Sequence, residues 1–241
     1  MSKKILIITP IVLLLLLALA FGLFRISKSR TFQFFGEIVH RVDTQEKVVA
    51  LTFDDAPTEI TTETLRILSE KDVPATFFVV GKNIEEYPEI AKAIVEQGHD
   101  LGNHSYSHQR FLLSKDTYSF VKSEIEKTNA LIREAGYEGE ITFRPPYGKK
   151  LFVLPWYLSK HNIKTIMVDV EPDTYHSGDA EAMFEYTIEQ TKPGSIILIH
   201  PDCDTVCAAG REALPKIIDE LRAEGYRFVT ISELLEYASA K

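Results

Sequence analysis

Residues 48–57, VVALTFDDAP, decide the fold of this chain, because an apolar run ends there in two carboxylates and a turn. The run 48–53 has the length and the β-branched content of a buried strand. Asp54 and Asp55 follow directly, and the Ala-Pro dipeptide that ends at Pro57 supplies the turn. Adjacent side chains of a strand point to opposite faces, so the two carboxylates can share one pocket only where the strand ends. Taken alone, the pair also fits a solvated turn.

Strand and helix patterns alternate outward from this run. Further strands are expected at 75–80, 165–168 and 195–199, and helices at 62–71, 84–95, 121–132, 214–221 and after a capping box at 230–233. This alternation predicts one α/β domain with a mostly parallel sheet, either open or closed as a barrel. In a barrel, chemistry belongs at the C-terminal ends of strands, where Asp54, Arg144, Asp169 and His200 all fall.

A second informative stretch is residues 104–108, HSYSH. One helical turn would place His104 and His108 on the same face, and a loop turn could achieve the same. Together with Asp54 and Asp55, the two imidazoles suffice to hold one metal ion and leave a free base. Three protein ligands with an open position are typical of a catalytic metal site. The remaining carboxylate can then take a proton from water that the metal activates.

Residues 1–30 are unlike the rest of the chain. Residues 5–24 form an almost unbroken apolar run with basic residues on both sides, and this length suffices to span a bilayer. Residues 18–20, ALA, also fit the cleavage site of a secretory signal peptide. Because the apolar run continues through Phe24, an uncleaved membrane anchor is favoured. The expected organisation is an anchor or signal segment at 1–30, a connector at 31–46 and an extracytoplasmic domain at 47–241, which would be secreted if the segment were cleaved.

The charge of the exported part excludes one class of partner. Residues 1–30 hold five of the 27 basic residues and none of the 35 acidic ones, so the remaining 22 basic and 35 acidic residues give −13. An acidic domain of this kind repels polyanions, and nucleic acid is not expected as a partner. Cys203 and Cys207 are the only cysteines. Outside the cytoplasm they predict a small disulfide, with a reactive thiol as the alternative.

Four motifs, in order, resemble those of the NodB-type polysaccharide deacetylases of carbohydrate esterase family 4. They are TFDDAP at 52–57, HSYSH at 104–108, RPPYG at 144–148 and LIH at 198–200. The resemblance runs from about Val48 to Tyr237, and four ordered motifs are far more specific than any single one. It implies a distorted (β/α) barrel of the NodB-homology type. The predicted fold is therefore this barrel, preceded by one N-terminal transmembrane helix.

The resemblance also implies a metal site beside a catalytic base. Asp54 would be the base, while Asp55, His104 and His108 would hold a divalent metal. Zn²⁺ is the expected ion, with Co²⁺ as the alternative.

Three further residues would complete the chemistry that the resemblance implies. Arg144 would hold Asp54 ionised and aimed through a charged hydrogen bond. The backbone N–H of Tyr147 would help stabilise the oxyanion, and His200 would protonate the departing amine. Each role also suits amide cleavage on physical grounds. The reaction needs activated water, a donor for the oxyanion, and an acid to protonate a poor leaving group.

The fourth family motif departs from its usual form. It reads DVEPDTY at 169–175, with Thr174 in the usual place of Asp and Tyr175 in that of Trp. Asp173 is expected to orient His200 instead, and the other two acidic residues of the motif, Glu171 and Asp169, are the alternatives.

The sequence thus predicts a membrane-anchored, metal-dependent N-deacetylase that acts on an N-acetylated glycan. Peptidoglycan amino sugars are the favoured substrate, followed by chitin-like or poly-N-acetylglucosamine chains. An O-deacetylase that uses the same site is the enzyme alternative, and a non-catalytic glycan-binding relative is the alternative from another class. Trp156, Tyr157 and Tyr175 could present apolar faces to sugar rings, or belong to the core and its rim.

Overall fold

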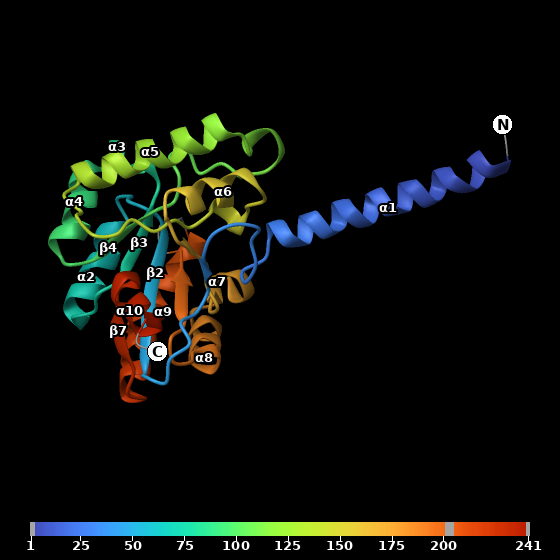
Figure 1. Cartoon of the computed structure of the whole chain (residues 1–241). Coiled ribbons are helices and arrows are strands. Elements are labelled where there is room, and N and C mark those ends of the chain that lie inside the picture. The colour runs from blue at the N-terminus through green and yellow to red at the C-terminus, as the bar shows by residue number, and fades with distance from the viewer. Residues whose placement is uncertain (1–2, 201–204, 240–241) are drawn as a thin grey trace.

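The computed structural model describes residues 3–200 and 205–239 of the chain (Figure 1). Its strands are β1 (Ile38–Val39), β2 (Val48–Ala56), β3 (Thr76–Val79), β4 (Asp100–Asn103), β5 (Thr165–Ile166), β6 (Ile196–Ile199) and β7 (Arg227–Val229). Its α-helices are α1 (Lys3–Ser27), α2 (Thr61–Lys71), α3 (Gly81–Glu86), α4 (Pro88–Glu96), α5 (Tyr118–Glu134), α6 (Val153–Lys160), α7 (Pro172–His176), α8 (Ala180–Gln190), α9 (Thr205–Ala223) and α10 (Ile231–Ser239). Two short 3-10 helices are η1 (Leu113–Lys115) and η2 (Pro146–Gly148).

The strands close into the distorted barrel that the motifs predict. A five-stranded parallel sheet has the order β4-β3-β2-β6, and β7 pairs with the start of β2. Single parallel bridges continue the ring from β4 to Phe143, from Phe143 to β5, and from Val170 to β6. β1 pairs in parallel with β5. Because the bridges between β4 and β6 are single, the barrel is closed but irregular on that side.

Each face of β2 packs into a different core. The residues that face α2, α4 and α9 are Val49, Leu51 and Phe53, and those that face the barrel interior are Val48 and Ala50. Since both faces are covered, residues 48–53 are apolar except for Thr52, as expected in a parallel sheet with helices outside it. Thr52 and Asp54 continue the inward-facing set toward the C-terminal end, so the periodicity of the strand aims Asp54 into the mouth of the barrel.

Some elements differ from those predicted from the sequence. The helical pattern at 84–95 forms two helices, because Pro88 lacks an N–H and begins α4 as its first residue. The capping box of α10 is present: the Thr230 N–H donates to Glu233 Oε2 at 2.8 Å, and the Glu233 N–H donates to Thr230 Oγ1 at 3.3 Å. The predicted connector at 31–46 contains β1, a two-residue strand too short to produce a periodic pattern.

The N-terminal helix α1 projects away from the barrel (Figure 1). Its segment Pro10–Ser27 has a mean hydropathy of 2.3 and is 6% buried, so it could be a membrane span or a signal sequence. The end of α1 and the chain that follows it lie against the barrel, where Ser27 is 1% and Gln33 9% exposed. The predicted disulfide between Cys203 and Cys207 falls outside the described residues, because Cys203 belongs to 201–204.

Candidate active site

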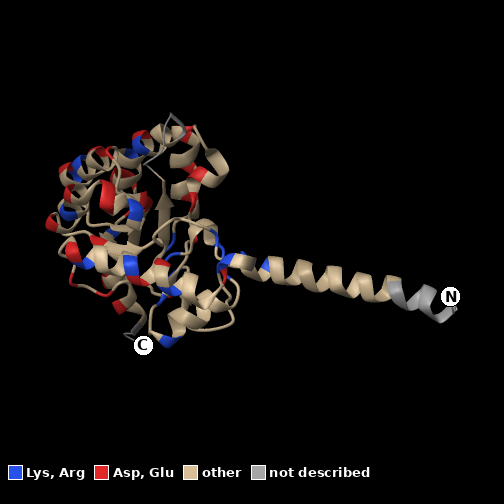
Figure 2. Ribbon diagram, turned by 90° about the horizontal axis from the view of Figure 1, so that it is seen from above, with Lys and Arg blue, Asp and Glu red and all other residues tan. Residues whose placement is uncertain are grey.

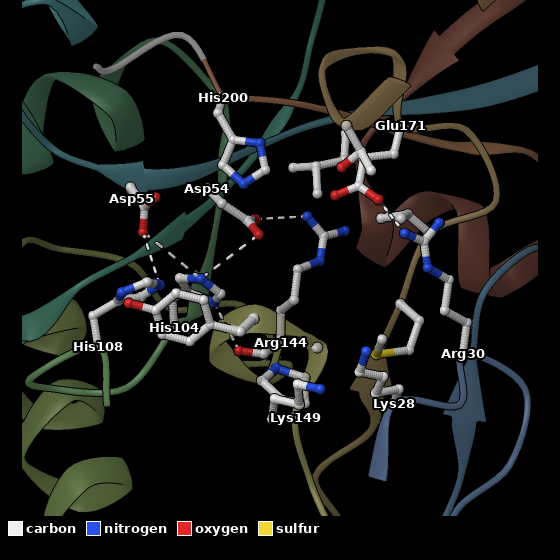
Figure 3. Close-up of a pocket in the computed structure, with 17 residues that line it drawn as sticks. Lys28, Arg30, Asp54, Asp55, His104, His108, Arg144, Lys149, Glu171 and His200 are labelled. Atoms are coloured by element: carbon white, nitrogen blue, oxygen red, sulfur yellow. Dashed lines mark hydrogen bonds and ion pairs between the residues drawn. The ribbon is translucent and has the colours of Figure 1, made fainter. Parts of the chain in front are cut away.

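The carboxyl ends of the barrel strands meet at one cavity of about 520 Å³ (Figure 3). Seven of the eight residues predicted from the sequence line it: Asp54, Asp55, His104, His108, Arg144, Tyr147 and His200. The eighth, Asp173, lies beside His200 in a smaller hollow of about 180 Å³. Segments more than a hundred residues apart in the chain therefore supply a single site.

An irregularity at the end of β2 lets both carboxylates face this cavity. The pairing of β2 with β3 shifts register between Asp54 and Ala56. Asp55 itself has a φ of 69°, in the left-handed region. A bulge of this kind re-aims a side chain that a regular strand would send to the opposite face. The strand thus continues through Ala56, three residues beyond the predicted end.

Asp54 is a buried carboxylate that stays ionised. Its side chain is paired with that of Arg144, whose Nη1 donates to Asp54 Oδ1 at 2.7 Å and to Thr52 Oγ1 at 3.0 Å. Burial by itself would raise the pKa of Asp54, but the charges of Arg144 and His104 hold it below its ordinary value. Its other oxygen, Oδ2, lies 3.6 Å from His104 Nε2. An ionised carboxylate with one oxygen not bound to Arg144 therefore faces the cavity.

Asp55, His104 and His108 form a group that can hold a metal ion, with ligand atoms all within 4.8 Å of one another. Asp55 Oδ1 lies 3.2 Å from His108 Nε2 and 3.8 Å from His104 Nε2. The Nδ1 of His104 is 2.8 Å from the Arg144 carbonyl oxygen. Because a carbonyl only accepts, Nδ1 is the nitrogen that carries a proton, and in the neutral ring Nε2 then has the lone pair that a metal needs.

The protonation state of His108 also suits metal binding. Burial and the neighbouring charge of His104 lower the pKa of His108 below its ordinary value. A neutral imidazole is the form that binds a metal. Two imidazoles and one carboxylate, with an open position between them, are the donor set of many catalytic zinc sites.

The two histidines are carried by a loop, so the loop alternative holds and the helical one does not. Ser105 and His108 have φ values of 68° and 53° in this loop. Hydrogen bonds hold the backbone of Ser105 in place. Its N–H donates to Asn103 Oδ1 at 2.7 Å, and its carbonyl accepts from the Gly81 N–H at 3.0 Å. The loop therefore has a defined shape before any ligand is bound.

Glu124 on α5 holds the other half of the same loop. The N–H groups of Tyr106 and Ser107 donate to Glu124 Oε2 at 3.1 and 2.8 Å, and the Ser107 hydroxyl donates to Oε1 at 2.8 Å. Glu124 is 6% exposed. No role was predicted for it from the sequence, although a carboxylate inside the apolar stripe at 121–132 was a usable signal.

His200 is bound to Asp173 by two hydrogen bonds. The backbone N–H and the Nδ1 of His200 lie 2.7 and 2.8 Å from Asp173 Oδ2. Burial by itself would lower the pKa of His200, but the hydrogen bond to Asp173 and its charge raise the pKa to about 9. With Nδ1 held by Asp173, Nε2 is the nitrogen that faces the cavity. His200 is thus an imidazolium near neutral pH.

The two alternatives to Asp173 have other partners. Asp169 accepts from the Ser195 hydroxyl and from the Ile196 N–H, both at 2.8 Å. Glu171 forms an ion pair with Arg30. Of the three acidic residues in the irregular motif, the structure brings Asp173 into contact with His200.

The aromatic residues divide between the core and the surface. Tyr157 is 1% exposed and donates its hydroxyl to Glu126, so it belongs to the core. Trp156 and Tyr175 are 39% and 60% exposed. The Tyr147 ring packs beside His108, at a centroid distance of 4.7 Å, and Tyr147 has a φ of 57°.

Comparison with known proteins decides the family. Residues 41–166 match the family model described as polysaccharide deacetylase. The chain belongs to the polysaccharide deacetylase family. Over 191 residues this polysaccharide deacetylase is 35% identical to a peptidoglycan-N-acetylglucosamine deacetylase of Bacillus cereus, with 78% of this chain and 68% of the relative covered. The family and the enzyme class that the four motifs predict are confirmed.

Two solved structures share the barrel of this polysaccharide deacetylase. One is a peptidoglycan N-acetylglucosamine deacetylase in complex with 4-naphthalen-1-yl-N-oxidanyl-benzamide, with a TM-score of 0.75, 32% identity, and 81% of this chain and 91% of that chain covered. The other is a pseudoenzyme of carbohydrate esterase family 4 from Bacillus anthracis, with a TM-score of 0.71, 30% identity, and 82% and 68% covered. The predicted fold class is confirmed by both.

Proposed function

We propose that this polysaccharide deacetylase removes N-acetyl groups from a cell-wall glycan, and that the amino sugars of peptidoglycan are its substrate. The observation that carries the proposal is the convergence of an ionised base, a group of metal ligands and an imidazolium on one cavity. The Bacillus cereus relative is named for N-acetylglucosamine in peptidoglycan, which supports this choice over chitin-like chains.

Asp55, His104 and His108 are the proposed ligands of a divalent metal, Zn²⁺ first and Co²⁺ as the alternative. The fit rests on the donor set and on the Nε2 lone pairs that face Asp55 Oδ1. Such an ion would polarise the acetyl carbonyl and lower the pKa of water.

Asp54 and His200 are the proposed base and acid. Asp54 accepts a proton from the attacking water at Oδ2, while Arg144 keeps the carboxylate ionised through Oδ1. His200 donates the proton on Nε2 to the departing amine, and Asp173 holds the ring by Nδ1. The backbone N–H of Tyr147 is the proposed donor to the oxyanion, from a backbone that η2 holds in the left-handed region.

The apolar helix α1 is the proposed membrane anchor, which leaves the catalytic domain on the extracytoplasmic side. Its segment Pro10–Ser27 has the length and hydropathy for a single crossing. A membrane-held enzyme with an external domain would meet the cell wall where the wall adjoins the membrane.

A panel of acetylated glycans, with acetate and free amine measured separately, tests the proposal on the full chain. Equal amounts of acetate and amine from an N-acetylated glycan are expected. Acetate without amine from an O-acetylated glycan would instead assign an O-deacetylase. No acetate from any glycan, with metal bound, would make the chain a non-catalytic relative like the pseudoenzyme of Bacillus anthracis.

A further inference from the structure

The segment that follows the membrane helix is built into the barrel. The backbone N–H of Lys150 donates to the Ser27 carbonyl at 3.1 Å, and the Lys150 ammonium donates to the Ser29 carbonyl. Lys150 is 1% exposed, and a buried ammonium is stable only where it is hydrogen-bonded. The segment 27–30 is therefore fixed to the stretch that also carries Tyr147.

The same segment reaches the opposite side of the catalytic cavity. Arg30 forms an ion pair with Glu171, two residues before Asp173. Lys28 and Arg30 line the cavity together with Asp54 and His200 (Figure 3). One wall of the active site thus comes from residues directly beyond the apolar helix.

Two lysines of this wall, Lys28 and Lys149, lie close together, and a third cation, Arg110, lies beside the lining residue Tyr147. The ammonium groups of Lys28 and Lys149 lie 4.5 and 4.8 Å from the centre of the same Phe24 ring. The Arg110 guanidinium lies 4.5 Å from the ring of Tyr147. Burial, and then the charges of Lys28 and Arg110, lower the pKa of Lys149. Lys28 and Arg110 are therefore each close enough to repel the charge of Lys149.

These cations lack acidic neighbours, unlike Arg30. Among residues 3–200 and 205–239, no carboxylate lies within 4.0 Å of the charged groups of Lys28, Lys149 or Arg110. Figure 2 shows basic residues where α1 meets the domain and acidic residues over much of the remaining surface. Because residues 31–241 carry a net charge of −13, a local cluster of such cations beside the cavity is a place where an anion is attracted.

We propose that Lys28 and Lys149 in the cavity wall, together with Arg110 beside Tyr147, form an anion subsite of the catalytic cavity, which binds a carboxylate or phosphate group carried by the glycan substrate. The proposal rests on the proposed function and names a substrate feature for the same cavity. Bound there, the anion would relieve the repulsion among the three cations, and its distance from the acetyl group would be set by the cavity. The charge of the substrate, in addition to its acetyl group, then decides which sugars are deacetylated.

The position of Lys28 also sets where the reaction occurs. Lys28 directly follows the segment Pro10–Ser27 that is apolar enough to cross a membrane. With that helix in a bilayer, the anion subsite lies at the membrane surface. An anionic group can come from two sources there: a carboxylate of the wall glycan, or a pyrophosphate that joins a glycan to a lipid.

The test compares substrates of equal length on the full chain in lipid nanodiscs. The substrates are a neutral chitin oligosaccharide, an oligosaccharide with a free carboxylate on alternate sugars, and a polyprenyl-pyrophosphate-linked N-acetylated disaccharide. The preferred anionic substrate should exceed the neutral one in kcat/KM by about threefold to tenfold, the range of one to two partly exposed charge pairs. This preference should shrink as salt is added. The carboxylate and the pyrophosphate arms distinguish the two sources.

Charge variants separate the subsite from a structural role. Lys28→Gln and Lys149→Gln should lower the preference for the anionic substrate. Lys28→Glu should invert it in favour of the neutral glycan. Lys28→Arg keeps the positive charge and should retain the preference. Lys92→Gln, an exposed residue paired with Glu96 on α4, is the control and should leave the preference intact. Equilibrium binding to metal-free protein compares the affinities for the neutral chitin oligosaccharide and the carboxylate-bearing one without turnover.

Equal kcat/KM for neutral and anionic substrates, or a preference that Lys28→Glu leaves unchanged, would overturn the subsite and leave the deacetylase function standing. No acetate from any of the three substrates would overturn both.

Discussion

Asp173 Oδ2 lies within hydrogen-bonding distance of two nitrogens of His200, the backbone N–H at 2.7 Å and the ring Nδ1 at 2.8 Å. Two donors on one oxygen fix both the position of the residue and the orientation of its ring. The usual acidic position of the family motif is Thr174 in this chain, so its neighbour has taken over the contact. The first turn of α7, which begins at Pro172, brings Asp173 to His200.

The Asp173→Asn variant should move the alkaline limb of the pH–rate profile to lower pH. Asp173 raises the pKa of His200 to about 9, so the acid stays protonated up to that pH. Without the carboxylate, burial still lowers the pKa of His200 and only the charges of Asp54 and Asp55 still raise it, so the pKa should fall below about 9. Turnover at pH 8 should therefore fall by about tenfold or more, with a smaller loss at pH 6. Metal content should not change.

The control for this prediction is Asp169→Asn, whose side chain contacts Ser195 and Ile196. Its alkaline limb should stay in place. A shift in Asp169→Asn together with none in Asp173→Asn would show that the acid is oriented by another residue.

Removal of the metal should abolish turnover, and added Zn²⁺ or Co²⁺ should restore it. The loss should be about a hundredfold or more, because a metal in such a site supplies several kcal/mol of charge stabilisation. His104→Ala should lose both the metal, measured by elemental analysis, and the activity. His161→Ala, at the exposed end of α6, serves as the control. Full activity in verified metal-free protein would contradict the assignment of Asp55, His104 and His108.

Asp54→Asn and Asp55→Asn should fail in different ways. Asp54 is held by Arg144 and aims a free oxygen at the cavity, so its amide variant should keep the metal and lose about 10²–10⁴ in kcat. Asp55 points its Oδ1 at both imidazoles, so its variant should weaken metal binding. Loss of metal from Asp54→Asn alone would exchange the two roles.

The features of this site that depend on residues near each other in the chain can be predicted from the sequence. Those that depend on pairing between separate segments cannot. The strand at 48–53 is predictable because both of its faces are buried, which makes every residue except Thr52 apolar. The site residues are predictable because they follow strands or belong to ordered motifs. The re-aiming of Asp55 depends on a register shift against β3, and no local pattern encodes it.

Contacts between distant segments are the part that sequence patterns miss. Lys28 and Arg30 follow an apolar helix and resemble the basic flank of any membrane span. Their place in the active site depends on Lys150 and Glu171, more than a hundred residues later. A basic flank has the same composition whether or not it packs against a catalytic domain.

Glu124→Gln should reduce metal affinity although Glu124 does not contact the cavity. Its two carboxylate oxygens accept three hydrogen bonds from Tyr106 and Ser107, in the loop between the two proposed histidine ligands. A glutamine has one acceptor oxygen and no charge, so the Ser107 hydroxyl must accept from the amide instead of donating, and the charge-assisted bonds to the two N–H groups become neutral ones, at a cost of about 1–3 kcal/mol in stability. The loop should loosen, and metal affinity should fall by about tenfold to a hundredfold, as is typical for residues that orient ligands.

A titration of the metal into apo protein measures this affinity, and thermal unfolding measures stability in the same samples. Glu134→Gln is the matched control, because Glu134 is an exposed residue of the same helix α5. The pattern expected for Glu124→Gln is weaker metal binding with turnover restored at saturating metal. That restoration distinguishes a residue that positions the ligands from one that takes part in the chemistry. A variant that binds the metal as tightly as the wild type would show that the loop keeps its shape without Glu124.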